Sequence, residues 1–240
     1  MSNIAVIFAG GTGQRMNTKT KPKQFLELHG KPIIVYTLEI FQEHDQIDGI
    51  VLVMLKEWIP YAKKLLKKYN LTKVVDVIPG GHTGQESIKN GVFRAGELYS
   101  HDSIILIHDG VRPLITAETI TNDIECVHRF GNAITTAQAV ETITINNEKN
   151  VVGNIVDRSK VEIAKAPQCF ILRDLVDVEN KAAADNQLSF IDTASLMKHY
   201  GHILYTVKGP RENIKITTPM DFYLFRAIMD ARENLQIEGI

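Results

Sequence analysis

The first half of the chain alternates apolar segments with segments whose apolar residues recur at helical spacing. The apolar segments are rich in β-branched residues, which suit strands buried on both faces of a parallel sheet. They predict strands at Ile4–Phe8, Ile50–Leu55, Val74–Ile78, Ser103–Ile107 and Ala133–Thr136. The segments between them predict helices at Ile33–Gln42, Trp58–Tyr69, Glu86–Leu98 and Ala117–Phe130. This order predicts a doubly wound α/β sheet with right-handed crossovers.

The alternation ends near Gln138. Two short strand-like segments, Ile143–Ile145 and Val151–Ile155, flank a polar turn and predict a hairpin. Because an isolated hairpin is only marginally stable, we expect it to project as an arm that pairs with another subunit. The rest of the chain predicts helices at Leu172–Lys181, Thr193–His199 and Pro219–Glu233, the last capped by Thr218, and a strand at Ile203–Val207. We expect a single domain over residues 1–240, with an arm at about 138–160.

Composition, net charge and cysteine content limit the classes of protein to which the chain can belong. With 240 residues, 44% of them hydrophobic and 23% charged, the chain is long enough for one large globular domain. A net charge of -1 gives no overall attraction to nucleic acid or to a membrane, so we expect neither as a partner. The start of the chain has no basic leader pattern, which predicts a cytoplasmic protein. Cys126 and Cys169 lack metal-ligand spacing and are predicted to be reduced thiols.

The first strand runs directly into a glycine-rich and then basic turn. Its glycines and the cations that follow are Gly10, Gly11, Gly13, Arg15, Lys21 and Lys23. Backbone N–H groups in such a turn can surround anionic oxygens, and the cations add the charge that a phosphate site needs. The Walker ending Gly-Lys-Ser/Thr is absent, and Met16 replaces the third glycine of the dinucleotide pattern. An ordinary strand-to-helix connection is the alternative, but the clustered charge favours a phosphate-binding loop.

Two further polar motifs follow predicted strands, at Pro79–Ser87 and His108–Pro113. Ligands of parallel α/β sheets bind beyond the carboxyl ends of the strands, where these motifs and the glycine turn are expected to meet. Asp109 is placed to meet a metal ion or a ribose hydroxyl, although Asp109 and Gly110 also suit a surface turn.

The remaining candidates each have a structural alternative. Thr83 and Glu86 have capping-box spacing, so Thr83 is predicted to be a helix cap, while the glycines before it and Ser87 are candidates for holding a flat base. Lys215 lies in an apolar segment before the last helix. It is either a surface lysine or a cation directed into the cleft at the strand ends.

Taken together, these segments resemble the cytidylyltransferases that couple a polyol phosphate to CTP. The resemblance is carried, in order and over nearly the whole chain, by AGGTGQRM with PKQF, the GG…S segment, HDGVRP, VDR at Val156–Arg158, APQ at Ala166–Gln168, and NIKITTP. One branch of this family uses 2-C-methyl-D-erythritol 4-phosphate for isoprenoid synthesis, and the other uses ribitol 5-phosphate for teichoic acid or capsule polymers. The resemblance implies a Rossmann-like nucleotidyltransferase domain, a mostly parallel sheet with helices on both faces, and a projecting β-hairpin arm. It also implies a homodimer whose active sites are shared between subunits.

The resemblance implies transfer of CMP from CTP to the polyol phosphate, with release of pyrophosphate and with Mg²⁺ or another divalent cation as cofactor. The second pKa of a phosphate monoester is about 6, so the acceptor is largely dianionic at neutral pH and needs no general base. Cations and backbone donors must instead stabilise the charge that develops. By the resemblance, the catalytic residues are Arg15, Lys23 and Lys215; the nucleotide-binding residues are Ala9, Gly10, Gly11, Thr12, Gly13, Gly81, Ser87 and Asp109; and the acceptor-binding residues are Arg112, Thr142, Arg158 and Asp192.

Several positions depart from the family pattern. His82 follows the double glycine, Ala166 replaces the threonine of Thr-Pro-Gln, and Ile191 replaces a hydroxyl residue before Asp192. Loss of two hydroxyls from the acceptor pocket can shift acceptor choice. The Ala-Gly-Gly turn and Val111 resemble the ribitol 5-phosphate branch, which we therefore favour over the 2-C-methyl-D-erythritol 4-phosphate branch.

Two other classes stay open from the sequence. An NAD-dependent dehydrogenase is disfavoured by the missing third glycine and by the basic residues beside the turn. A catalytically silent nucleotide-binding protein is suggested by the altered acceptor positions. It is disfavoured because ordering so many long charged side chains without a ligand costs rotamer entropy, up to about 2 kcal/mol each.

Overall fold

The computed structural model describes residues 1–10, 21–147, 151–187 and 189–237 of the chain. Its centre is a seven-stranded sheet with the order β11-β7-β10-β6-β1-β4-β5. The strands are β1 (Asn3–Ala9), β4 (Gly49–Met54), β5 (Val74–Pro79), β6 (Ile104–Asp109), β7 (Asn132–Gln138), β10 (Glu162–Ile171) and β11 (Thr206–Lys208). Neighbours pair in parallel, except that β10 is antiparallel to both β6 and β7.

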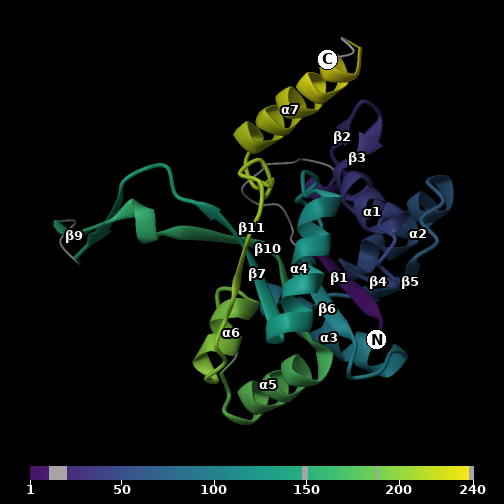
Figure 1. The fold of residues 1–240 in the computed structure, drawn as a ribbon. Coiled ribbons are helices and arrows are strands. Elements are labelled where there is room, and N and C mark those ends of the chain that lie inside the picture. Colours follow the sequence, from purple (N-terminus) through teal and green to yellow (C-terminus); the bar gives the residue numbers. More distant parts are fainter. Residues whose placement is uncertain (11–20, 148–150, 188, 238–240) are drawn as a thin grey trace.

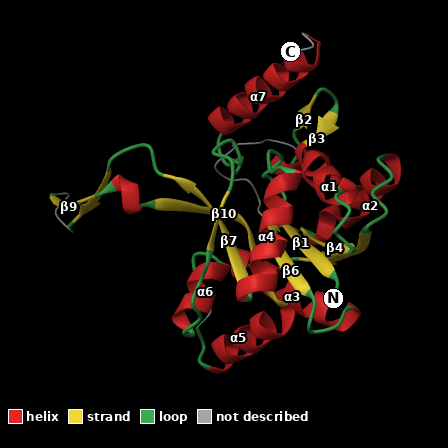
Figure 2. Cartoon of the chain, viewed as in Figure 1, coloured by secondary structure: helices red, strands yellow, loops and turns green. Residues whose placement is uncertain are grey.

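Helices cover both faces of this sheet (Figure 2). They are α1 (Ile33–Glu43), α2 (Ile59–Lys68), α3 (Gly84–Leu98), α4 (Ala117–Phe130), α5 (Leu172–Ala184) and α6 (Thr193–His199), whereas α7 (Pro219–Ile237) packs elsewhere. Successive side chains of β1 point to opposite cores, as the pleat of a strand requires. Ala5 and Ile7 belong to the core formed with α1, α2 and α4, whereas Ile4 and Val6 belong to the core formed with α3, α5 and α6. The fold class predicted from the sequence is confirmed.

Helix α7 belongs to a third, smaller core. Phe225 of α7 packs with Leu28 and Ile216, and its ring meets that of Tyr36 at 5.4 Å in an edge-on arrangement. Leu28 lies in β2 (Glu27–Leu28), which pairs with β3 (Lys31–Pro32) beside α7 (Figure 1). The segment that leads into α7 carries Lys215, so this core fixes the approach of Lys215 to the sheet.

Most predicted elements occur within a few residues of their expected bounds. The helices Ala117–Phe130 and Thr193–His199 agree at both ends. Helix α3 begins at Gly84 instead of Glu86, because Thr83 is its N-cap and accepts a hydrogen bond from the backbone of Glu86 at 3.1 Å. Thr218 likewise accepts from the backbone N–H of Asp221 at the start of α7.

Strand β10 was not predicted. Pro167 interrupts an otherwise strand-like segment, and a proline within such a segment argues against a central strand. The sheet accommodates it at a register shift between Ala164 and Gln168 in the pairing with β7, where Pro167 need not donate to the ladder. The predicted strand Ile203–Val207 is also shortened to Thr206–Lys208. The residues just before this strand bond to the side chain of Asn132 instead. That side chain donates to the carbonyl of Ile203 and accepts from the backbone N–H of Tyr205.

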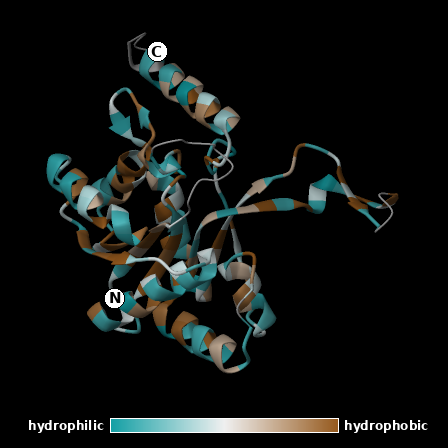
Figure 3. Cartoon of the chain, turned by 180° about the vertical axis from the view of Figure 1, so that it is seen from behind, coloured by the Kyte–Doolittle hydropathy of each residue, from teal (hydrophilic) through white to brown (hydrophobic). Residues whose placement is uncertain are grey.

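The predicted hairpin is present and projects from the sheet (Figure 1). Strands β8 (Ile143–Asn146) and β9 (Val152–Val156) form a separate antiparallel pair. Hydrophobic positions recur along the ribbon of the arm (Figure 3). The exposed apolar residues there are Val140, Ile145, Val151, Val152, Ile155 and Ile163. The described part of the arm therefore has no core of its own.

One smaller expectation concerns the cysteines. Cys126 and Cys169 are free thiols, as predicted. Within the described part of the chain, no helix combines the length and apolar character needed to cross a bilayer.

Candidate active site

Two adjoining cavities lie at the carboxyl ends of β1 and β6. The loop-side cavity, about 290 Å³, is lined by Ala9 and Gly10 at the end of β1, the 3₁₀ helix Lys23–Phe25 and the segment before α3. The helix-side cavity, about 430 Å³, is lined by β10, the start of α3, α5 and the segment that leads into α6. The walls they share are Phe8, Thr83, Gly84, Asp109 and Lys215. Asp109 and Lys215 therefore stand where a ligand in one cavity would meet a ligand in the other.

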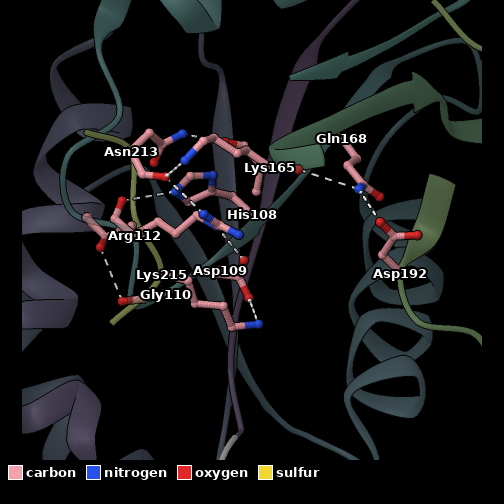
Figure 4. A network of polar contacts seen from close by, with 11 residues as sticks. His108, Asp109, Gly110, Arg112, Lys165, Gln168, Asp192, Asn213 and Lys215 are labelled. Carbon is pink, nitrogen blue, oxygen red and sulfur yellow. Dashed lines mark hydrogen bonds and ion pairs between the residues drawn. The ribbon is translucent and has the colours of Figure 1, made fainter. Parts of the chain in front are cut away.

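Asp109 is the buried centre of an ion-paired group (Figure 4). Its Oδ1 lies 2.6 Å from Lys215 Nζ, and its Oδ2 accepts from Arg112 Nε at 2.8 Å. Burial alone would raise the pKa of Asp109, but the nearby Lys215 and Arg112 outweigh this effect and lower the pKa to about 2. The carboxylate is thus ionised at neutral pH and holds both cations at the shared wall.

A further cation, Lys165 on β10, stands beside Arg112. The backbone carbonyl of Asn213 accepts from Arg112 at 2.9 Å and from Lys165 Nζ at 3.2 Å, and Lys165 also donates to the carbonyl of Arg211 (Figure 4). Burial and the charge of Arg112 lower the pKa of Lys165. Within the described residues, Lys165 makes no ion pair with a carboxylate. Lys165 therefore adds a positive charge, not ion-paired with any described carboxylate, to the part of the helix-side cavity beside Arg112, where an anion could bind.

The opposite side of the helix-side cavity carries Gln168 and Asp192 (Figure 4). Gln168 donates to Asp192 Oδ2 at 2.9 Å and accepts from the backbone of Ala194. Asp192 Oδ1 accepts from the backbone and the hydroxyl of Ser195 at the start of α6. Both side chains are therefore held by partners within the protein.

Hydrogen bonds shape the glycine segment before α3. Ser87 donates to the carbonyl of Thr83 at 2.9 Å and accepts from the backbone N–H of Gly81 at 3.1 Å. A side chain at Gly80 would place its Cβ 2.7 Å from Ser87 Oγ, which explains why glycine is needed here. On the other wall, Gln24 donates to the carbonyl of Ala9 at 2.7 Å and ties the end of β1 to the 3₁₀ helix.

His108 comes directly before Asp109 but is fully buried beneath the cavities. Burial lowers the pKa of His108 to about 4, so the imidazole is neutral at physiological pH. One ring nitrogen meets the carbonyl of Arg112 at 3.2 Å, and the ring packs on Phe41. His108 therefore supports the turn that carries Asp109 and Arg112.

The structure brings most of the predicted site residues together. Those that line one or both cavities are Ala9, Gly10, Lys23, Gly81, Ser87, Asp109, Arg112, Asp192 and Lys215. Gly11, Thr12, Gly13 and Arg15 lie outside the described residues. Lys21 pairs with Glu27 at 3.3 Å and lines neither cavity.

Thr142 and Arg158 lie on the arm and line neither cavity of their own chain. Arg158 donates to the carbonyl of Val140 at 3.2 Å. Among the described side chains it does not pair with Asp157 or Glu162, the two acids closest in sequence. Asp157 instead accepts from Ser159, and Glu162 accepts from Thr136.

Sequence reasoning missed Lys165 and Glu179, which both line the helix-side cavity. Lys165 directly precedes the Ala166–Gln168 motif, so a search of the charged residues next to that motif would have identified it. Nothing local marks Glu179, which lies on an ordinary amphipathic helix. Two altered family positions, Ala166 and Ile191, also line this cavity, and the Ile191 side chain is 97% exposed.

Asp109 is the described carboxylate that lines both cavities, and so the one that a metal ion bound to the CTP phosphates could meet. Both oxygens of Asp109 already face cations, and the one described group of three acidic or imidazole ligands is His29, Asp230 and Glu233, none of which lines a cavity. Mg²⁺ commonly binds one or two carboxylates together with the substrate phosphates. The donor set therefore suits an ion that arrives with a triphosphate better than one held by the protein alone.

The fold, together with the loop-side and helix-side cavities and the cations that line them, defines a Rossmann-like nucleotidyltransferase. A family model described as 2-C-methyl-D-erythritol 4-phosphate cytidylyltransferase matches residues 3–231, and the chain belongs to this family. Its members are nucleotidyltransferase enzymes, as predicted. The match also removes the dehydrogenase alternative.

Relatives from both branches cover nearly the whole chain. A ribitol-5-phosphate cytidylyltransferase of Vibrio parahaemolyticus is 53% identical over 99% of this chain and 100% of the relative. One of Streptococcus agalactiae is 51% identical over 100% of each chain. A 2-C-methyl-D-erythritol 4-phosphate cytidylyltransferase of Clostridium botulinum is 37% identical over 95% of this chain and 97% of the relative.

A solved structure shares the fold. The 4-diphosphocytidyl-2C-methyl-D-erythritol synthase of Anaerococcus prevotii superposes with a TM-score of 0.82 at 25% identity, over 95% of this chain and 96% of the other. The sheet and its connections are thus those of the family.

Proposed function

We propose that this chain transfers CMP from CTP to D-ribitol 5-phosphate and forms CDP-ribitol and pyrophosphate. The observation that carries the proposal is the shared wall of the two cavities, where Asp109 holds Lys215 and Arg112. The higher identity to relatives named for ribitol 5-phosphate supports this acceptor.

In the proposed reaction, CTP occupies the loop-side cavity and the acceptor occupies the helix-side cavity. A phosphate oxygen of the acceptor attacks the α-phosphorus of CTP, and the bond from that phosphorus to the β-phosphate oxygen breaks as pyrophosphate leaves. The acceptor phosphate is already largely dianionic, so no side chain has to remove a proton. Lys23, Lys215 and, outside the described residues, Arg15 stabilise the charge that develops on the phosphates.

The proposal includes a divalent cation, Mg²⁺ in the first instance. When bound with CTP, it would neutralise phosphate charge, and Asp109 is the described residue that could reach it. Lys215 and Arg112 share this carboxylate and orient it toward the shared wall.

We also propose that the chain forms a homodimer through the arm, with Thr142 and Arg158 completing the site of the other subunit. The exposed apolar residues of the arm and the marginal stability of an isolated hairpin support pairing. The planar guanidinium of Arg158 suits a phosphate monoester. The proposal further assigns a cytoplasmic location and a role in supplying CDP-ribitol for teichoic acid or capsule polymers, as the ribitol branch implies.

The family model keeps 2-C-methyl-D-erythritol 4-phosphate as the second candidate acceptor. A pyrophosphate-release screen of the purified protein with Mg²⁺, CTP and a panel of polyol phosphates separates the two. We expect the highest kcat/KM with ribitol 5-phosphate. A clear preference for 2-C-methyl-D-erythritol 4-phosphate would overturn the acceptor assignment, and no turnover with any acceptor would favour a catalytically silent protein.

A further inference from the structure

Glu179 is a buried acid that neither the fold nor the proposed reaction explains. It lies on α5, lines the helix-side cavity, and is only 2% exposed. Within the described part of the chain, its Oε1 has no hydrogen-bond partner. A buried polar atom without a partner is costly, and such groups are uncommon in native proteins. An acid in this position therefore needs an explanation from what enters the cavity.

The walls around Glu179 are mostly apolar. Ile88 of α3, Phe190 from the segment before α6, and Leu196 of α6 line the same cavity, and the core behind it is apolar too. Burial raises the pKa of Glu179 to about 7, with Lys89 opposing the shift. Near neutral pH the carboxyl can therefore accept a hydrogen bond or, when protonated, donate one.

The cavity has two chemically different sides. Arg112, Lys165 and Lys215 form its cationic side, which adjoins the loop-side cavity (Figure 4). The acceptor phosphate must bind on this side, because it has to reach the α-phosphate of CTP. The polyol chain then extends away from the cations, toward the walls made by α5 and α6.

Few polar groups on that second side are available to a ligand. Gln168 and Asp192 bind each other and the start of α6, and Gln85 accepts from the backbone of Phe190 at 2.8 Å. Glu179 is the acid on this side whose Oε1 has no such partner. Ser189 and Thr193 also line this side of the cavity. Glu179 differs from them in being a buried acid with an unpartnered oxygen, which is placed to bind a hydroxyl that is far from the phosphate.

We propose that Glu179 is a specificity-determining residue that hydrogen-bonds a distal hydroxyl of the acceptor, and so selects a five-carbon over a four-carbon polyol phosphate. This inference rests on the proposed function. It predicts that Glu179 contributes to acceptor binding in proportion to chain length and contributes nothing to CTP binding.

The test compares Glu179→Leu, Glu179→Gln and the wild type with ribitol 5-phosphate and with erythritol 4-phosphate, which is one hydroxylated carbon shorter. Asp177→Asn is the control, since Asp177 is an exposed acid on the same helix. Loss of one hydroxyl contact should raise KM for ribitol 5-phosphate by about tenfold or more in Glu179→Leu. KM for erythritol 4-phosphate and for CTP should stay near the wild-type values, and Glu179→Gln, which keeps polar atoms, should lie in between.

The outcomes separate this inference from the function on which it rests. If the wild type prefers the four-carbon acceptor, the proposed acceptor and the role of Glu179 are both wrong. The second case is a wild type that prefers ribitol 5-phosphate and a Glu179→Leu variant whose KM rises equally for both acceptors, or for neither. The function then stands and the inference is overturned. Glu179→Gln has nearly the same shape as the wild type. It therefore supplies the same comparison if the leucine variant does not fold.

Discussion

Lys215 Nζ lies 2.6 Å from Asp109 Oδ1, although the two residues are more than a hundred positions apart in the chain. Asp109 ends β6, and Lys215 comes from the segment that leads into α7. The contact closes the wall that the two cavities share, so a phosphate in either cavity meets the same cation. Arg112 holds the other oxygen of Asp109 and fixes the carboxylate in this position.

Lys23→Ala should nearly abolish turnover and leave the fold intact. Lys23 lines the loop-side cavity, where a cation can stabilise charge that grows as pyrophosphate leaves. Loss of one such contact typically lowers kcat by about 10²–10³-fold. Steady-state kinetics with circular dichroism as the folding control measures this. A near-wild-type kcat would show that Lys23 does not contact the reacting phosphates.

Lys165→Met should weaken binding of the acceptor but not binding of the nucleotide. Lys165 lines the helix-side cavity only and adds positive charge that no described carboxylate neutralises by an ion pair. We expect an acceptor KM about tenfold higher and an unchanged KM for CTP, because a charge-assisted hydrogen bond is worth about 1.5–3 kcal/mol. Lys165→Arg, which keeps the charge, is the control. If Lys165→Met instead raises both KM values, Lys165 only holds the carbonyls of Arg211 and Asn213 in place.

Asp123→Asn should stabilise the protein at high pH. Asp123 is buried on α4, and burial raises its pKa to about 8, although Thr135 donates to it at 2.8 Å. The unfolded carboxyl ionises near its ordinary pKa of about 3.9, so the wild type loses stability as pH rises from there to about 8. The advantage of the asparagine variant should grow across this range and exceed about 1 kcal/mol at its upper end.

Urea unfolding of Asp123→Asn at several pH values measures this effect, with Glu125→Gln as the control, since Glu125 is an exposed acid on the same helix. A stability difference that does not change with pH would mean that Asp123 is ionised in the folded protein.

Mixed dimers test the arm. Arg158→Ala and Lys23→Ala subunits should each be inactive as homodimers, whereas a mixed dimer regains one site with both residues. Subunit exchange followed by activity measurement should therefore restore up to about half of the wild-type activity per mixed dimer. An active monomer, or verified mixed dimers without activity, would contradict the shared site.

The sequence predicted the parallel part of the sheet because segments such as Ile50–Leu55 are continuous, apolar and rich in β-branched residues. Such segments are typical of strands buried on both faces of a parallel sheet. The sequence did not predict β10, since a proline within a strand-like segment argues against a strand. Pro167 is tolerated in β10 because it lies at a register shift. The motifs located Asp109 and Arg112, which lie within one turn. The Ala166–Gln168 motif marked the neighbourhood of Lys165, but the carbonyl that Lys165 shares with Arg112 is a tertiary contact that the sequence does not show. Glu179 was out of reach because its meaning comes from a cavity wall made by several separate elements.

Transfer of label from [α-³²P]CTP tests the central claim most directly. The account predicts that, with Mg²⁺ and ribitol 5-phosphate, the label appears in CDP-ribitol while the released pyrophosphate is unlabelled, because the bond between the α-phosphorus and the β-phosphate oxygen breaks. Lys23→Ala is the negative control. Label recovered only as CMP, or labelled product formed with 2-C-methyl-D-erythritol 4-phosphate but not with ribitol 5-phosphate, would contradict it.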